Sequence, residues 1–405
     1  MKLVHITTVP ETLGFLTGQV GFMGRQGFEV HAVSSPGAGL DRFCSREHIP
    51  AHPVEMTRRI TPLRDIAALF RIWRLFRRIR PTIVHAHTPK AGLLGMLAAV
   101  AARVPVRIFE IHGLPYLTAS GLRRRLLKWA TNIACRVSHR VLCVSFSIRD
   151  LAISTGLCPD WKITVSARGS VNGVDAADAF NPARHAPDSS HRVRTRYGIS
   201  RESAVMGFVG RLVRDKGLVE LSAAWTSLRD EFPGLEWLLV GDAEPHDPLP
   251  PNVLAQLRSD PRIHWTGWVD DLPELYGVMN LLVLPSYREG FPVVALEAAA
   301  MGLPIVATRV PGCIDAVEDG ITGVLVEPRD PSVLAEAIRN YLRDPELRTR
   351  HAEAARQRVI RDFQPARIWH AVKAEYLSLL QKRGLVSPEQ SAVPIAMPGW
   401  EERAS

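Results

Sequence analysis

The chain lacks the marks of a disulfide framework or a thiolate metal site. Its 405 residues include five cysteines, which are scattered and form no Cys-x-x-Cys pair. This usage suits a reducing compartment and argues against a disulfide-rich secreted domain. There is no Asp-x-Asp motif, and no group of His, Cys and acidic residues has metal-ligand spacing. The sequence therefore predicts no bound metal and no cofactor.

Long apolar runs are also missing. The longest apolar stretch, Gly92 to Val106, is interrupted by Arg103 and is too short to span a bilayer. The N-terminus, Met-Lys-Leu-Val-His-Ile, enters a strand pattern at once, without the layout of a signal peptide. The expectation is a cytoplasmic protein that is soluble or peripheral on the inner face of the plasma membrane.

The charge is strongly basic, with a formal net charge of +9. Such a balance suits nucleic acid, an anionic membrane surface or a phosphate-rich ligand. The basic residues concentrate in Arg71–Arg80 and Arg123–Lys128, and neither stretch has a helix-turn-helix, zinc-finger or RNP pattern. A nucleic-acid partner is therefore not predicted.

The first basic stretch predicts an amphipathic helix over Ile66–Arg80. Either this helix packs on the sheet with its arginines in water, or it docks on an anionic membrane leaflet. Two basic clusters in one half of the chain favour docking. The residues assigned to the membrane surface are Arg71, Arg74, Arg77, Arg78, Arg123, Arg124, Arg125 and Lys128.

Short apolar runs alternate with helical patterns along the whole chain. One series extends from Leu3–Ile6 to Lys162–Val165, and a second from Ala204–Val209 to Gly323–Val326. Alternation of this kind predicts an α/β fold of two Rossmann-like, doubly wound domains that face each other across a cleft. A polar stretch from Ala176 to Ser203 separates the series. The predicted domains are residues 1–185 and 186–365, followed by a helix at 366–383 and a disordered tail at 384–405.

The loop after the strand Ala204–Val209 carries two cations. Gly210 allows a sharp turn, and Arg211 and Lys216 stand before a helix that begins near Leu218. A helix N-terminus favours anions, and a guanidinium with an ammonium suits a diphosphate. An ordinary turn with solvated basic residues is the equal alternative for this loop alone.

The segment Glu289–Glu297 follows another apolar strand, Leu281–Leu284. Pro292 is suited to the first helical position and Gly302 to the residue after the helix end. Glu297 then lies in the second turn and leans back toward the N-terminus, near Glu289. Two carboxylates at one helix start can accept hydrogen bonds from the hydroxyls of a ribose and a sugar. The sequence neighbours of Glu297 are mostly Val, Leu and Ala. Such apolar neighbours argue against a Glu297 side chain that is simply exposed to solvent.

These segments, with Val240-Gly-Asp242 and Thr266-Gly-Trp-Val-Asp270, resemble the retaining family-4 glycosyltransferases of GT-B fold over residues 1 to 383. The resemblance implies that Arg211 and Lys216 contact the donor diphosphate, that Glu297 holds the ribose and that Val269 borders the base. It also implies that the helix after Ala366 crosses back onto the first domain. The residues that it assigns to the donor are Gly210, Arg211, Lys216, Val269, Glu289, Gly290, Phe291, Pro292, Val293 and Glu297.

The first half contributes further candidates. His112, in Phe109-Glu-Ile-His-Gly113, resembles the family histidine near the reacting carbon and joins Glu289, Arg211 and Lys216 as the expected catalytic set. His85-Ala-His-Thr-Pro-Lys90 resembles members that extend capsule, exopolysaccharide or lipid-linked chains. His87 and Lys90 are accordingly assigned to the acceptor; a solvated Lys90 is the equal alternative. Gly14 and Gly18 join them, although the family usually has adjacent glycines there.

The expected function is metal-independent transfer of a sugar, with retention, from a nucleotide donor (a UDP-sugar) to a bacterial glycan or polyprenyl-diphosphate-linked acceptor. Two alternatives stay open. A nucleotide-sugar epimerase can have the same architecture, and a sugar-nucleotide-binding subunit can have lost catalysis.

Overall fold

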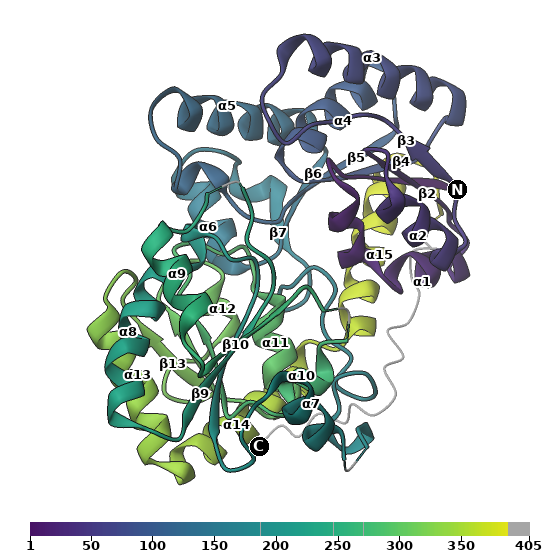
Figure 1. Ribbon diagram of the computed structural model, residues 1–405. Helices are drawn as coiled ribbons and strands as arrows, with labels where there is room; N and C mark the ends of the chain where they lie inside the picture. The colour runs from purple at the N-terminus through teal and green to yellow at the C-terminus, as the bar shows by residue number, and fades with distance from the viewer. Residues whose placement is uncertain (187, 246, 270, 388–405) are drawn as a thin grey trace. The chain divides into compact units, whose positions relative to one another are not determined.

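A computed structural model describes residues 1–186, 188–245, 247–269 and 271–387, and it divides the chain into two compact units (Figure 1). The first unit contains residues 1–110, 130–142 and the C-terminal segment from Ala366, and the second contains residues 111–129 and 143–365. The predicted α/β class is confirmed by two sheets of seven and six strands. Asp270 of the predicted Thr266–Asp270 motif and the tail after Ser387 lie outside the described residues.

The seven-stranded sheet has the order β3-β2-β1-β4-β5-β6-β7, with parallel pairing from β3 through β5. Its strands are β1 (Lys2–Ile6), β2 (Glu29–Ser34), β3 (Ala51–Pro53), β4 (Ile83–His87), β5 (Val106–Ile111), β6 (Arg140–Cys143) and β7 (Ile163–Val165). The strands β1, β4 and β5 are buried at nearly every residue, as expected of central strands that are covered on both faces. The short edge strand β3 was missed, since it is only half-buried and ends at Pro53.

Helices pack on this sheet within the first unit. They are α1 (Gln19–Arg25), α2 (Ala38–Glu47), α3 (Pro62–Ile79), α4 (Pro89–Ala101) and, at the C-terminus, α15 (Pro365–Lys382). The predicted basic helix is α3, which begins four residues earlier than expected. The helix α15 lies against this unit: the hydroxyl of Tyr376 is 2.7 Å from Nδ1 of His85, and Nζ of Lys373 donates to Gln26 (Figure 1). The helix α5 (Gly121–Val137) follows β5.

The six-stranded sheet of the second unit is parallel throughout and has the order β10-β9-β8-β11-β12-β13. Its strands are β8 (Ala204–Val209), β9 (Leu235–Val240), β10 (Ile263–Gly267), β11 (Leu281–Leu284), β12 (Ile305–Thr308) and β13 (Gly323–Val326). The order reverses beside β8, so the loops after β8 and β11 lie at the switch point where such sheets bind ligands. A buried Trp225–Trp237 pair stands in the core on one face.

The helices of this unit are α6 (Phe146–Ser154), α7 (Ser189–Tyr197), α8 (Leu218–Glu231), α9 (Pro251–Ser259), α10 (Pro273–Tyr276), α11 (Val293–Ala300), α12 (Cys313–Ala316), α13 (Pro331–Arg343) and α14 (Pro345–Asp362). The helix α7 lies inside the polar stretch that the sequence suggested to be a linker. Of its nine residues only Val193 is buried, so it has almost no apolar periodicity to detect.

Candidate functional site

The loop between β8 and α8 places two cations in front of a helix. A 3-10 turn, Arg214–Lys216, leads into Gly217, which precedes α8 with φ +73°. A Cβ at Gly217 would lie 1.9 Å from the carbonyl oxygen of Pro285, so the turn packs directly on the chain after β11. Arg211 is half-exposed and donates to Glu244 at 2.9 Å. The loop therefore has the geometry expected of an anion site.

Lys216 and Glu289 lie together. The Lys216 ammonium donates to Oε1 of Glu289, and the same oxygen accepts from the hydroxyl of Ser286 at 2.7 Å. Both side chains are more than four-fifths buried. The sequence placed these residues on different loops, and the structure brings them into one partly buried ion pair. A phosphate anion that reached Lys216 would compete with Glu289 for it.

The helix α11 supports the second carboxylate. Pro292 occupies the N-cap position and not the first helical position expected from the sequence, so α11 begins one residue later, at Val293. Gly302 follows the helix end with φ +77°, as expected. Oε2 of Glu297 accepts from the hydroxyl of Tyr276 at 2.8 Å. Burial raises the pKa of Glu297 to about 7, against the opposing effect of that hydrogen bond. Burial also raises the pKa of Tyr276, which keeps its hydroxyl protonated as a donor.

The pKa of Glu297 predicts a pH dependence of ligand binding. A carboxylate accepts two ribose hydroxyls, whereas the protonated acid loses acceptor capacity. Affinity for a UDP-sugar, whose diphosphate diester stays ionised, is therefore expected to fall about tenfold per pH unit below 7. Tyr276→Phe should move the midpoint to higher pH, because it removes a donor that stabilises the carboxylate. Calorimetric titrations from pH 5.5 to 8.5 measure both effects.

The matched variant for this prediction is Glu297→Gln, which has no charge to titrate. Its affinity should be weak and independent of pH over the same range. Two results together would assign the titration to another group. The midpoint of the pH dependence of affinity would be unchanged in Tyr276→Phe, and the affinity of Glu297→Gln would still vary with pH.

The loop between Glu289 and α11 is fixed by its neighbours. A Cβ on Gly290 would lie 1.8 Å from the carbonyl oxygen of His112, so only glycine fits there. Ser145 donates its hydroxyl to the carbonyl oxygen of Gly290 at 2.7 Å. The ring of Phe291 is buried and lies 5.4 Å from that of Phe363. The structure thus places the backbone of the predicted His112 directly against the predicted sugar-binding loop.

An ion pair that the sequence did not indicate joins three loops of this unit. Nε of Arg288 donates to Asp215 at 2.9 Å and to the hydroxyl of Thr118 at 2.8 Å. Thr118 lies in the loop after His112, Asp215 beside Lys216, and Arg288 next to Glu289. The pair therefore positions three predicted site residues through their chain neighbours.

Sequence reasoning missed Tyr276, Ser145, Ser286 and this ion pair. Of these residues, Ser145 could have been found from the sequence. It stands between an apolar strand and a helix, and serine is a preferred N-cap residue; its side chain does cap α6. The remaining predicted donor residues, Val269 and Val293, are half-buried. Val269 lies just after β10, and Val293 is the first residue of α11.

The predicted acceptor residues belong to the first unit. Gly14 is exposed in a 3-10 helix, and Gly18 packs on the Trp369 ring. His87 is fully buried: its Nε2 is 3.0 Å from Nδ1 of His5 and its Nδ1 is 2.9 Å from Glu110. His87 is the last residue of β4, and its ring lies in the core. Its assignment to the acceptor stays a prediction.

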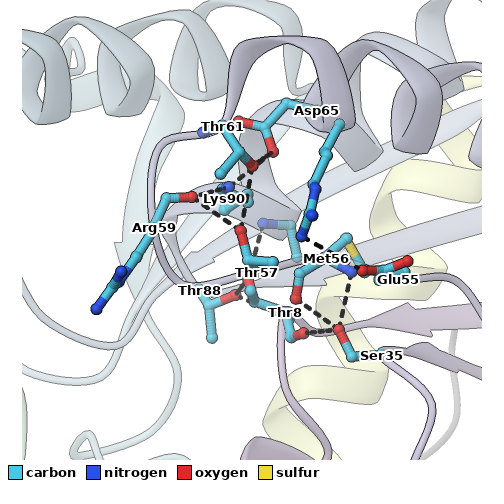
Figure 2. A network of polar contacts seen from close by, with 12 residues as sticks. Thr8, Ser35, Glu55, Met56, Thr57, Arg59, Thr61, Asp65, Thr88 and Lys90 are labelled. Atoms are coloured by element: carbon cyan, nitrogen blue, oxygen red, sulfur yellow. Dashed lines mark hydrogen bonds and ion pairs between the residues drawn. The ribbon is translucent and has the colours of Figure 1, made fainter. Parts of the chain in front are cut away.

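Lys90 is held in a polar network at the start of α4, shown in Figure 2. Its ammonium donates to Asp65 of α3 at 2.7 Å and to the carbonyl oxygen of Arg59. The hydroxyls of Thr8 and Thr88 are 2.7 Å apart, and Thr8 also accepts from the amide of Ala91. Lys90 is therefore mostly buried and ion-paired with Asp65. It is not a solvated lysine, and it would have to leave Asp65 to contact an acceptor phosphate.

The basic side chains assigned to the membrane surface, from Arg71 to Arg78 on α3 and from Arg123 to Lys128 on α5, are exposed. Within the described ranges no helix is both long enough and apolar enough to cross a bilayer.

Comparison with known proteins adds two family matches. Residues 19–169 match the glycosyl transferase 4-like domain, and residues 203–344 match the glycosyl transferases group 1 family. The chain is 30% identical over 381 residues to the capsular polysaccharide biosynthesis glycosyltransferase CapM of Staphylococcus aureus, covering 94% of this chain and 98% of that protein.

A second relative is the UDP-Gal:alpha-D-GlcNAc-diphosphoundecaprenol alpha-1,3-galactosyltransferase of Escherichia coli. It is 26% identical over 386 residues, which cover 94% of this chain and 97% of that protein. Among solved structures, Anabaena Alr3699/HepE in complex with UDP and glucose superposes with a TM-score of 0.78 at 22% identity, over 93% of this chain and 99% of that one. That likeness concerns the fold.

Proposed function

Since the chain belongs to the retaining family-4 (group 1) glycosyltransferases of GT-B fold, we propose that it transfers a sugar from a UDP-sugar to a lipid-linked glycan in surface polysaccharide synthesis. The observation that carries the proposal is the pair formed by Lys216 and Glu289 beside the start of α11, with Glu297 one turn inside that helix. An ammonium, two carboxylates and helix-terminal amides meet the needs of a diphosphate, a sugar and a ribose.

Binding of the donor would exchange partners within the site. The diphosphate takes Lys216 from Glu289 and Arg211 from Glu244, and the released Glu289 accepts hydrogen bonds from the sugar hydroxyls. Glu297, held by Tyr276, accepts from the ribose. Fixed cations and amides then stabilise the charge on the leaving diphosphate without a metal ion, and the diphosphate assists the incoming hydroxyl on the same face of the sugar.

The acceptor class rests on the relatives. The Escherichia coli protein is named for a sugar linked to diphosphoundecaprenol, and the Staphylococcus aureus protein for capsule synthesis. We extend this class to the present chain, with the first unit as the acceptor-binding part and the cytoplasmic side of the plasma membrane as the place of action. The donor is proposed to be UDP-linked, as in the Anabaena complex.

A thermal-shift series with UDP, ADP, GDP and their sugars tests the donor assignment. A ligand at a hundred times its dissociation constant stabilises the folded state by about 2.7 kcal/mol. UDP and one or more UDP-sugars should raise the melting temperature of the wild type, and Lys216→Ala should abolish the rise. A series in which no nucleotide stabilises the wild type would contradict the proposal.

The two alternatives are separated by product analysis. Release of UDP from the donor that depends on a polyprenyl-diphosphate sugar indicates transfer. Donor epimerisation without any acceptor indicates an epimerase, and nucleotide binding without turnover indicates a binding subunit. Glu289→Ala serves as the control that should bind nucleotide and release none.

The outer face of α3 supports docking on an anionic membrane. Leu63, Ile66 and Phe70 follow at three- and four-residue steps and are 85%, 65% and 56% exposed. Arg71 and Arg74 are exposed beside them. A helix with exposed apolar side chains and flanking arginines suits the boundary between headgroups and acyl chains. Docking would bring the protein to a lipid-linked acceptor.

Co-sedimentation with vesicles checks this docking. The wild type should bind anionic vesicles and bind neutral ones much less. The double variant Leu63→Ser, Phe70→Ser should weaken binding at least about tenfold, because buried apolar side chains of this size contribute roughly 1.5–3 kcal/mol each. The matched control Val333→Ser, Ile360→Ser removes two exposed apolar residues of the second unit and should bind normally. Equal, negligible wild-type binding to both vesicles would exclude docking.

A further inference from the structure

Three histidines gather in the interior of the first unit, on two adjacent strands. His5 of β1 pairs in register with His85 of β4, and His87 follows two residues later on the same face of β4. Glu110 of β5 pairs in register with His87. All four side chains are at least 93% buried. Such a concentration of polar groups in a sheet core is costly unless each group has a partner.

Close contacts orient two of these imidazoles. The Nδ1 of His87 lies 2.9 Å from Oε2 of Glu110, and the Nε2 of His87 lies 3.0 Å from Nδ1 of His5. The Nε2 of His5 is buried and has no hydrogen-bond partner among the described residues. A buried ring nitrogen without a partner calls for an explanation, and a metal ion would supply one.

His85 has an outer partner of a different kind. Its Nδ1 is 2.7 Å from the hydroxyl of Tyr376 on α15. Two of the three imidazoles are thus oriented through one ring nitrogen by a carboxylate or a hydroxyl, which is the arrangement that orients metal-binding histidines.

We propose that His5, His85 and His87 bind one divalent transition-metal ion, of which Zn²⁺ is the best match, with Glu110 and Tyr376 as outer hydrogen-bond partners. One ligand atom from each histidine lies within 4.8 Å of the others. Ligands of tetrahedral zinc, at about 2.0–2.1 Å from the metal, are roughly 3.4 Å apart. Binding would therefore require the rings to rotate until the ligand atoms reach that spacing.

The ligand type indicates which metals fit the cluster. Imidazole suits zinc, copper and nickel better than magnesium or calcium. The ion would tie β1 to β4 and would have a structural role, since the proposed transfer reaction uses Lys216 and Arg211 of the second unit for its charge.

Metal content and affinity of the full-length protein test the proposal. After dialysis against a chelator, the wild type should bind one equivalent of Zn²⁺ in competition with a chromophoric indicator. His5→Ala and His87→Ala should each lower the affinity at least a hundredfold. The matched control is His52→Ala. His52 forms a comparable pair with His31 in the same unit, 3.1 Å apart, and belongs to neither three-residue cluster with metal-ligand spacing among the described residues. His52→Ala should bind as the wild type does.

A measurement on the wild type alone covers the case in which the variants do not fold. X-ray absorption at the zinc edge should show three imidazole nitrogens at about 2.0–2.1 Å. Stoichiometric Zn²⁺ without imidazole ligands, full Zn²⁺ affinity in the His5→Ala variant, or no binding of Zn²⁺ by the wild type would each overturn the proposal and leave the cluster as a hydrogen-bonded core.

Discussion

Replacing Glu289 by glutamine is expected to reduce sugar transfer by about a thousandfold while UDP still binds. The carboxylate of Glu289 balances Lys216 and accepts from Ser286, so it stands where the sugar of the donor would meet the diphosphate site. Removing one group that stabilises a transition state commonly costs 10²–10³-fold, roughly 2.7–4 kcal/mol. A neutral amide cannot replace the charge, but it releases Lys216, so UDP affinity should be equal or higher.

Turnover and UDP affinity are measured on the same preparation. The control is Glu327→Gln, which removes a carboxylate that is 71% exposed and 3.5 Å from Arg309. It should keep both properties. A Glu289→Gln enzyme with near-normal turnover would remove Glu289 from the catalytic set, and a loss of turnover and of UDP binding together would make it a structural residue.

Replacing Gly290 by alanine is expected to lower turnover by about a hundredfold or more. The new methyl group would lie 1.8 Å from the carbonyl oxygen of His112, which is backbone and cannot rotate away. The loop must shift, and a displacement of about 1 Å in a positioned site can cost 10²-fold. Since the same loop is also held by Ser145, an additional loss of roughly 1–3 kcal/mol in the free energy of unfolding should accompany the change.

The control for Gly290→Ala is Gly234→Ala. Gly234 is exposed, and a Cβ there would have no heavy atom within 4 Å, so activity and stability should stay close to the wild type. Turnover and denaturant unfolding report the two effects separately. Full activity of Gly290→Ala would show that the loop does not need its observed position.

Much of the fold could be predicted from the sequence, because parallel strands that are buried on both faces appear as short apolar segments. The strands β8, β11 and β13 begin and end where the pattern predicted. The failures have local causes. The strand β3 is a three-residue edge, and α7 buries one side chain, so neither has the periodicity that reveals an element.

The sequence identified candidate residues for the site but not their contacts. Strand ends and glycines identified Lys216, Glu289 and Glu297, because sheet topology brings such loops together. The contact of Glu289 with Lys216 and that of Tyr276 with Glu297 join residues that are 73 and 21 positions apart. Such pairs depend on loop conformation, which one sequence does not specify.

The first unit shows most clearly what could not be predicted from the sequence. His87 was assigned to an acceptor from the family resemblance of its segment, and its ring lies in the core with His5 and Glu110. Spacing along the chain gave no sign of a three-histidine cluster, since 80 residues separate His5 from His85. Only the register of β1 against β4 brings them together.

Retaining transfer from a UDP-sugar to a lipid-linked acceptor is tested most directly by incubating the enzyme with a labelled UDP-sugar and a polyprenyl-diphosphate sugar. The linkage in the glycolipid is then determined by NMR. One new linkage should form per UDP released, and it should have the anomeric configuration of the donor. An inverted linkage, or UDP release and donor epimerisation without glycolipid, would contradict it.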